Sequence, residues 1–349
     1  MSGLSLSMRR GILLGLPWIH RLGIGIGSIG LIALGGGFLV IRSWLEDEIR
    51  EGSDITACLG GPRVAPTDRD GNANFGPILE RSDAPLFHDA VGSIARRMGV
   101  RPPEEIRLAY LPCCGVLTRR RRRVLLIGLP LLPVLTRGEF QAVLAHELAH
   151  LARGDATRIM DAIRYVEALG RGLDDPRART WGPLRAWSAA CRRVGEAVAA
   201  PIARGQEVRA DRVSASIAGG VVAASALAKV AMVQPLFREV LARFSGAGPG
   251  SPNLFATFRG LWDRLPEPFR EEMRRRLQVD QEAAPGDPHP PLADRLTALQ
   301  RFPDRAEAGT DALPAWGLLN DPEWLEEMLH ESLFRRMEAR PNVFHRAGS

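Results

Sequence analysis

Cysteine is scarce in this sequence, and the few cysteines do not form the pattern of a disulfide framework. The 349 residues contain only Cys58, Cys113, Cys114 and Cys191. Small domains held together by disulfides are much richer in cysteine. No pair of cysteines has the two-residue separation that thiolate zinc sites use. These absences argue against a disulfide-stabilised fold and against a thiolate zinc site, and they leave the cellular compartment open.

Acidic residues are outnumbered by basic ones, most of which are arginine. Lysine and arginine number 46 against 40 acidic residues, which gives a formal net charge of +6 and a pI near 9.8. This excess suits anionic lipid or nucleic acid, and it is also common in ordinary enzymes. The sequence lacks an aromatic-interleaved basic groove and any recognised nucleic-acid-binding motif. It therefore disfavours nucleic acid as a partner, and salt-dependent binding to DNA would reverse that interpretation.

Long apolar runs are also few, and one is long enough to cross a membrane. Residues 22–41 read LGIGIGSIGLIALGGGFLVI, which is 20 residues without a charge. A helix of this length spans the hydrocarbon core of a bilayer. Trp18 and Trp44 flank the run where interfacial anchors are expected. The run predicts one transmembrane helix and a single-pass membrane protein, located in the cell membrane if the source is bacterial.

Two other interpretations of this run compete. A signal peptide has a shorter apolar stretch and a small-residue cleavage site, which is missing here. A nucleotide-binding loop is also disfavoured, because Gly23, Gly25 and Ser28 do not match the dinucleotide fingerprint. Three arginines precede the run, and Arg42 and Arg50 follow it. The positive-inside rule leans weakly toward an amino terminus inside and the large domain on the far side, so sidedness stays open.

The rest of the chain predicts a mainly helical α+β fold with a small sheet. An amphipathic helix is expected over residues 84–98, strands over 106–111 and 124–129, and mostly helices from Thr136 onward. The arginine run 119–123 lies between the two strands, where it could touch acidic lipid or form a solvated hairpin tip, which is favoured. The proposed segments are a basic amino-terminal segment (1–21), the membrane helix (22–41), a linker (42–83), the main domain (84–300) and a helical extension (301–349).

One predicted helix contains candidate metal ligands and a candidate general base. Thr136 and Glu139 form a capping box at its start. His146 and His150 follow on one face, because residues four apart lie above each other on a helix. Two neutral imidazoles so placed can bind one zinc ion, and Glu147 can reach a zinc-bound water without ligating the metal. The HExxH pattern therefore predicts two metal ligands and a general base.

A catalytic zinc site needs a third protein ligand and an open position. Glu207 is the candidate, and Asp211 lies one turn further on the same predicted helix. Asp211 could accept an N–H from a ligand imidazole and so fix its tautomer. An acidic pair with this spacing is by itself often only a solvated helix face. Its position downstream of the histidines favours the metal site.

These motifs resemble a known family. HELAHLARGD followed by QEVRADRVSASIAG resembles the HtpX and CAAX-prenyl-protease group of gluzincin zinc metallopeptidases. PLFHDAVGSIARRMGVRPPEEIRLAY and VLLIGLPLLPVLTRGEFQAVLAHELAH are similar to earlier segments of that family. The resemblance covers about residues 84–300 and implies a zincin-like metallopeptidase domain. It implies one zinc ion per chain on His146, His150 and Glu207, with Glu147 as base and then proton donor.

Three further residues are implied by the same resemblance. Asp211 would orient a ligand histidine. His289 and Arg295, in the stretch HPPLADRL, would lie near the substrate as catalytic groups that hydrogen-bond the oxyanion, or would support the site. The chain departs from the family in two ways. Residues 111–115 read LPCCG in place of an Asn-Ala-Phe-like segment. In addition, the chain has one predicted membrane span where HtpX has four.

The sequence thus predicts a membrane-anchored zinc endopeptidase that acts on a protein or peptide substrate and contacts membrane lipid. The alternative is a membrane-tethered scaffold or regulator with a non-catalytic zinc site, and Glu147 argues against it because a structural site needs no base. The oligomeric state and the identity of the substrate are not indicated by the sequence.

Overall fold

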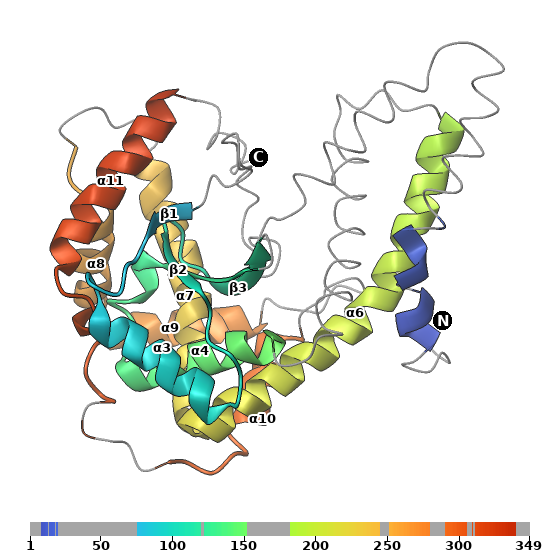
Figure 1. Ribbon diagram of the computed structural model, residues 1–349, viewed down its shortest axis with the longest axis horizontal. Coiled ribbons are helices and arrows are strands. Elements are labelled where there is room, and N and C mark those ends of the chain that lie inside the picture. Colours follow the sequence, from blue (N-terminus) through green and yellow to red (C-terminus); the bar gives the residue numbers. More distant parts are fainter. Residues whose placement is uncertain are drawn as a thin grey trace. The chain divides into compact units, whose positions relative to one another are not determined.

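The computed structural model describes residues 8–12, 14–17, 19, 75–119, 122–151, 182–244, 251–279, 290–305, 309 and 311–339 (Figure 1). The predicted membrane run at 22–41 and His289 lie outside these residues. The chain forms two compact units. Unit 1 comprises Met1–Asp54, Arg153–Glu207 and Ala283–Pro290, and unit 2 comprises Ile55–Ala152, Val208–Glu282 and Pro291–Ser349.

Unit 2 contains a four-stranded sheet with the strand order β1-β2-β4-β3. The strands are β1 (Phe75–Ile78), β2 (Glu105–Ala109), β3 (Cys114–Arg119) and β4 (Arg122–Gly128). The predicted strands near 106–111 and 124–129 correspond to β2 and β4, which pair in parallel, while β1 and β3 are antiparallel to their neighbours. The sequence predicted a linker over residues 42–83, and this was wrong for β1, whose short FGPI segment has no alternating pattern.

The strands β3 and β4 form a hairpin in which Arg119 pairs with Arg122. Arg119, Arg122 and Arg123 therefore lie at the end of a hairpin, as favoured from the sequence, and Arg120 and Arg121 lie outside the described residues. Gly128, at the end of β4, allows a close approach of the chain before β3, because a Cβ atom there would lie 2.1 Å from the carbonyl oxygen of Leu111. Its N–H donates to the carbonyl oxygen of Cys113 at 2.6 Å. This contact brings the start of β3 next to the segment that leads into the helix Arg137–Leu151.

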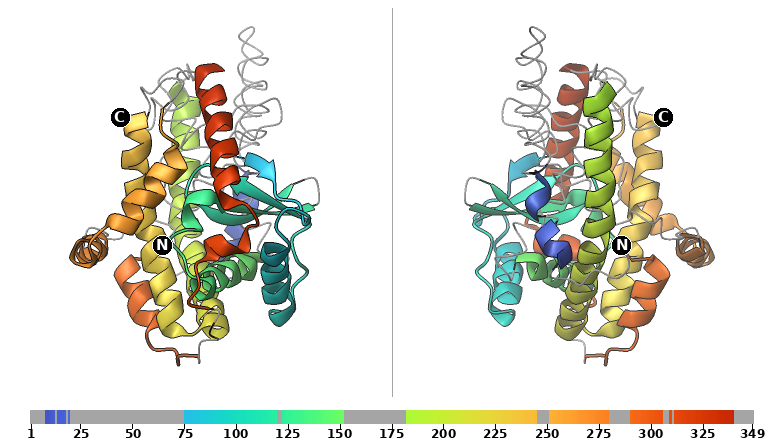
Figure 2. Two further views of the ribbon diagram at one scale, coloured as in Figure 1. Left: turned by 90° about the vertical axis from the view of Figure 1, so that its left-hand side faces the viewer. Right: turned by 90° about the vertical axis from the view of Figure 1, so that its right-hand side faces the viewer.

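Helices make up most of unit 2, which confirms the mainly helical α+β prediction. The helix α3 (Pro85–Arg97) buries the predicted apolar stripe and ends before Gly99, whose φ of 65° favours glycine. Helix α7 (Gly220–Phe244) packs against α4, α8, α9 and α10 (Figure 2). The remaining elements are η2 (Leu129–Leu131), α4 (Arg137–Leu151), α8 (Leu254–Arg264), α9 (Glu267–Val279), α10 (Leu292–Leu299), η3 (Ala315–Leu318) and α11 (Pro322–Ala339).

Helix α7 is the one helix of the described residues that is long and apolar enough to cross a membrane. Its most apolar window is only 44% buried. However, Met232, Val233 and Phe237 lie in the main core with Phe140 of α4, and its alanines pack in a second cluster with α10. A core helix of a soluble domain passes the same length and composition test, so this helix is weak support for a membrane span.

The start of α4 is held by a buried polar cluster around Glu139. The predicted capping box is present, because the Thr136 N–H donates to Glu139 at 2.8 Å and the Glu139 N–H donates to the Thr136 hydroxyl at 3.2 Å. Glu139 is 5% exposed and also accepts hydrogen bonds from Ser225 and Lys229 of α7, each at 2.7 Å. Lys229 is the only lysine in the chain. The cluster satisfies a buried carboxylate and ties the first turn of α4 to α7.

Unit 1 is described through helical residues among 8–19 and through the first part of α6 (Gly182–Ala218). These two segments share a small hydrophobic cluster that includes Leu16, Cys191 and Val198. Helix α6 continues without interruption past Glu207, the last residue of unit 1 along this helix, to Ala218. It therefore supplies residues to both units.

Candidate active site

Helix α4 presents His146, Glu147 and His150 in its last turns, and all three side chains are partly exposed. The Nε2 atoms of His146 and His150 lie 3.3 Å apart. Their ring centroids are 5.0 Å apart and the ring planes are inclined by 75°. The four-residue spacing thus brings one nitrogen of each ring to a common point.

Glu207 reaches the same point from α6. One ligand atom from each of His146, His150 and Glu207 lies within 4.8 Å of the others. Ligands of a tetrahedral zinc ion, at about 2.0–2.1 Å from the metal, are separated by about 3.3–3.4 Å. The two histidine nitrogens already have that separation, and a small side-chain movement would bring the carboxylate to it. Two imidazoles and one carboxylate, all partly exposed, fit a catalytic zinc ion with a position left for water.

Asp211 contacts His146 directly, and Arg295 contacts Asp211. Oδ1 of Asp211 lies 3.1 Å from Nδ1 of His146. The Arg295 guanidinium donates two hydrogen bonds to the Asp211 carboxylate, each at 2.8 Å. All three side chains are largely buried, with Asp211 at 6% exposure. Arg295 therefore lies against the carboxylate that contacts His146, which favours the supporting role among the two that the sequence left open.

The charge of Asp211 follows from these contacts. Burial on its own would raise the pKa of Asp211, but the hydrogen bonds from Arg295 and His146 outweigh it and hold the pKa below its usual value. An ionised Asp211 accepts the Nδ1–H of His146, which leaves Nε2 of His146 as the atom that can ligate. Because this pKa is depressed, the pair stabilises the fold at neutral pH, and that contribution is lost as the pH falls through the lowered value.

The segment where the chain departs from the family pattern lies beside Glu147. Cys114 begins β3, and β3 packs against α4. Burial, followed by the nearby Glu147 carboxylate, raises the pKa of Cys114 well above its usual value. A buried neutral thiol is neither a nucleophile nor a zinc ligand. Cys114 therefore forms part of the wall next to Glu147, a neighbour that the sequence did not reveal.

Ser214 is a second contributor that sequence reasoning missed. Its hydroxyl is buried and donates to the carbonyl oxygen of Ala142 at 2.8 Å, so that α6 is attached to α4. Glu207, Asp211 and Ser214 follow one another at four- and three-residue intervals and share one face of α6. This polar stripe was the feature of the sequence from which the position of Ser214 could have been predicted. His289, the remaining candidate, lies outside the described residues.

Comparison with known proteins agrees with this geometry. The chain matches peptidase family M48 over residues 113–302, which is more than half of its length. The matched segment contains β3, β4, α4, α6, α7 and α10, and it begins after residues 84–112, which the sequence resemblance had included. No curated protein and no solved structure matches the chain. The chain, whose helices α4 and α6 carry three side chains that could hold a metal ion, belongs to peptidase family M48, which contains the HtpX and CAAX-prenyl-protease type zinc metallopeptidases.

Proposed function

We propose that this protein is a zinc-dependent endopeptidase, with the metal held by His146, His150 and Glu207 and with Glu147 as general base. The observation that carries the proposal is the convergence of these three ligand groups at a spacing that suits zinc. Membership of a metallopeptidase family supports the reaction class. One ion per chain follows from the single group of three ligands among the described residues.

The chain's own residues have separate roles in hydrolysis. Zinc, when bound, polarises the scissile carbonyl and lowers the pKa of a coordinated water toward about 7. Glu147 follows a ligand directly in the chain, so its carboxylate accepts the proton of the attacking water and delivers it to the leaving amine. Asp211 keeps His146 in the ligating tautomer, and Arg295 keeps Asp211 ionised and in place.

Cleavage within a chain is supported by the position of β3. Among the described residues β3 pairs only with β4, so its other edge has main-chain groups available to an extended peptide. Peptides commonly bind by adding a strand to such an edge. Because β3 packs against α4, a peptide aligned there would run past Glu147 with both of its ends free to continue. This arrangement suits an internal bond of a protein or peptide substrate.

Chelation tests the proposed function directly. We expect the purified chain to contain zinc and to cleave casein, to lose both properties in 1,10-phenanthroline, and to regain cleavage when zinc is restored. Metal analysis and a fluorescent casein assay measure the two properties together. A chain that binds zinc but cleaves neither casein nor itself would favour the scaffold function and would contradict the peptidase.

Arg295 separates a supporting role from a direct catalytic one. Because Arg295 holds Asp211, we expect Arg295→Met to weaken zinc affinity by about 10–100-fold, the usual effect of losing a partner of a ligand histidine. Competition with a chromophoric chelator measures the affinity. The matched control is Arg301→Met, which removes an exposed arginine close by. Unchanged zinc affinity with a reduced kcat would instead place Arg295 on the substrate oxyanion.

Membrane attachment through residues 22–41 is the second part of the proposal. It is supported by the 20-residue uncharged run and by the frequent membrane association of M48 peptidases. Anionic lipid is then a natural contact for the arginine-rich chain. The peptidase domain is proposed to span residues 84–300, and the extension from 301 adds α11, whose Leu325, Leu329 and Leu333 pack into the same core.

A further inference from the structure

The only lysine of the chain joins α7 to the start of α4. Of the 46 lysine and arginine residues, Lys229 alone is a lysine. Its ammonium group donates to the Glu139 carboxylate at 2.7 Å and to the carbonyl oxygen of Val134 at 3.3 Å. A compact ammonium can donate to two acceptors in different directions, whereas the planar guanidinium of arginine suits a paired acceptor such as one carboxylate. Lys229 therefore holds the turn that leads into α4 together with the first turn of that helix.

Small apolar side chains fill the contact between α4 and the two helices α6 and α7. Ala142 of α4 lies in one buried cluster with Ala215 of α6 and with Ala223 and Ala226 of α7. Such side chains form only shallow ridges, so they let helices approach closely but do little to fix how far one helix is shifted along another. The position of α4 along α6 and α7 must therefore depend on other contacts.

Polar contacts at regular intervals on α4 supply that position. They lie at residues 139, 142 and 146, which are separated by three and four residues and so follow one side of the helix. The contacts are Glu139 with Lys229 of α7, the carbonyl oxygen of Ala142 with Ser214 of α6, and His146 with Asp211 of α6. The HExxH helix is thus attached to α7 at its start and to α6 in the two turns that follow.

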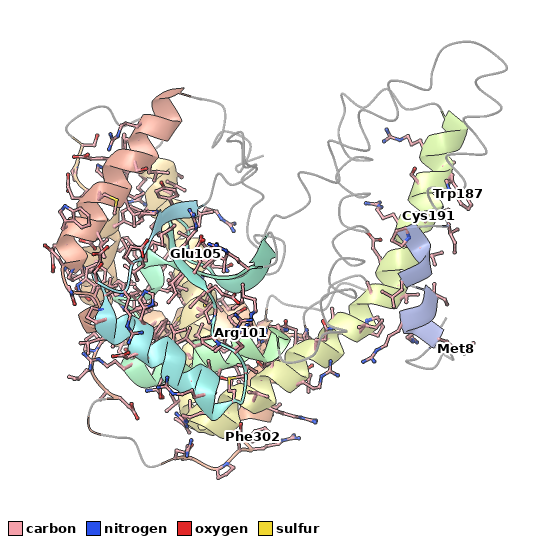
Figure 3. All side chains as sticks on the ribbon, in the orientation of Figure 1. Met8, Arg101, Glu105, Trp187, Cys191 and Phe302 are labelled. Carbon is pink, nitrogen blue, oxygen red and sulfur yellow. The ribbon has the colours of Figure 1, made fainter. Side chains whose placement is uncertain are left out.

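The two partner helices are held to each other by a tight junction. Only Gly219 separates α6 from α7, and its φ of 95° favours glycine. A Cβ atom on Gly220 would lie 2.6 Å from the carbonyl oxygen of Phe302, which is labelled in Figure 3, so the chain packs closely here. Lys229 on α7 is therefore held in a fixed relation to Asp211 on α6.

We propose that Lys229 is a positioning residue for the peptidase reaction, because it sets the place of α4 through Glu139 and so aligns His146 with Asp211. The inference rests on the proposed function. Glu139 precedes His146 by seven residues, or roughly 10 Å along the helix, so Lys229 acts through the helix and not on the substrate. Metal ligands must lie within about 0.2 Å of their ideal distances, and a misplacement of about 1 Å can cost about 100-fold in rate.

The ion pair suits alignment better than it suits stability. The side chain of Glu139 is 7% exposed and that of Lys229 is 24% exposed. Burying two charges costs about as much as their attraction returns, so an uncharged pair of similar size is often equally stable. A charged hydrogen bond, however, has a defined length and direction, which an apolar contact lacks. Removing one partner should therefore destabilise the fold, whereas removing both charges should restore stability without restoring alignment.

Two variants of the full chain separate these effects. We expect Lys229→Met, which leaves a buried carboxylate without its cation, to lower the Tm measured after chelation by roughly 10 °C. We expect it also to lower kcat on casein by about 100-fold with little change in KM. Adding Glu139→Gln removes the stranded charge and keeps the capping box. The double variant is expected to regain most of the Tm while kcat stays low.

Metal binding gives a readout that does not depend on hydrolysis. Zinc affinity, measured by competition with a chromophoric chelator, is expected to fall by about 10-fold in the single and the double variant, the smaller effect expected of a group that acts through another residue. The visible absorption spectrum of the cobalt-substituted chain reports the geometry of the ligands and is expected to change in both. Arg238→Met is the matched control, since it removes a positive charge from an exposed position of the same helix. It is expected to keep the Tm, the zinc affinity and kcat.

The double variant decides between alignment and a purely structural pair. Recovery of kcat, zinc affinity and the cobalt spectrum together with the Tm would show that the pair only stabilises the fold, and would overturn the proposal. An unchanged kcat and zinc affinity in Lys229→Met would overturn it as well. Failure of the proposed function looks different, because the unaltered chain would then bind zinc and cleave nothing. In that case the zinc affinity and the cobalt spectrum of the variants still test whether Lys229 aligns the metal site.

Discussion

Replacing Glu147 with glutamine is expected to reduce peptide hydrolysis by about 10²–10⁴-fold, the range that a positioned acid–base group contributes. The amide has nearly the same shape as the carboxylate but cannot accept the proton of the attacking water. Because Glu147 is absent from the group of three side chains that can hold a metal, zinc content is expected to stay unchanged. Initial rates on casein and metal analysis of the same preparation measure the two quantities.

The control for this variant is Glu239→Gln on α7, which makes the same chemical change at a side chain that is 64% exposed. That variant is expected to keep full activity. If Glu147→Gln retained hydrolysis, another group would have to act as the base. If the variant lost its zinc as well as its activity, Glu147 would be acting as a ligand, and the assignment of Glu207 would need to be replaced.

Glu207→Gln is expected to weaken zinc binding by on the order of 100-fold or more. Four-ligand zinc sites bind with about 10–16 kcal/mol in total, so one ligand accounts for about 3 kcal/mol, and a neutral amide is a much poorer ligand than a carboxylate. The two histidines would remain and would still hold the metal weakly. Activity is therefore expected to be lost at low zinc and to return in part at high zinc, as measured by titrating zinc against the rate of casein cleavage.

Glu196→Gln provides the comparison for Glu207, because it lies on the same helix about three turns earlier and its side chain is 43% exposed. It is expected to bind zinc normally. Equal zinc affinity in the two variants would show that α6 does not supply the third ligand. The folding of both variants can be compared by thermal denaturation after chelation, when the metal no longer contributes to stability.

Local patterns in the sequence anticipated the parts of the site that lie on single helices. The capping box of Thr136 and Glu139, the pairing of His146 with His150, and the one-turn relation of Glu207 to Asp211 all follow from helical periodicity over a few residues. The arginine hairpin was anticipated for a similar reason, since two β-like runs flank it. The helix α3 lies close to its predicted range because it has a clear apolar stripe.

Contacts between distant segments were not accessible in this way. Strand β1 has four residues and no alternation, so its place in the sheet depends on pairing with β2. Cys114 is a neighbour of Glu147 only because β3 packs on α4. Ser225 and Lys229 meet Glu139 across two helices, and nothing local in α7 predicts that carboxylate. Each of these contacts depends on burial and packing over long sequence separations, which periodicity does not encode.

The sequence by itself predicted the reaction class and the residues proposed to carry it, because two histidines four apart, a glutamate between them and an acidic pair downstream follow helix periodicity. Only the tertiary structure decided that α4 and α6 bring these groups together, and that Arg295 holds Asp211 at 2.8 Å. It also decided that Leu16 packs on α6. The reason is physical: a helix fixes neighbours within a turn or two, whereas the meeting of helices is fixed by the apolar surfaces they bury against each other.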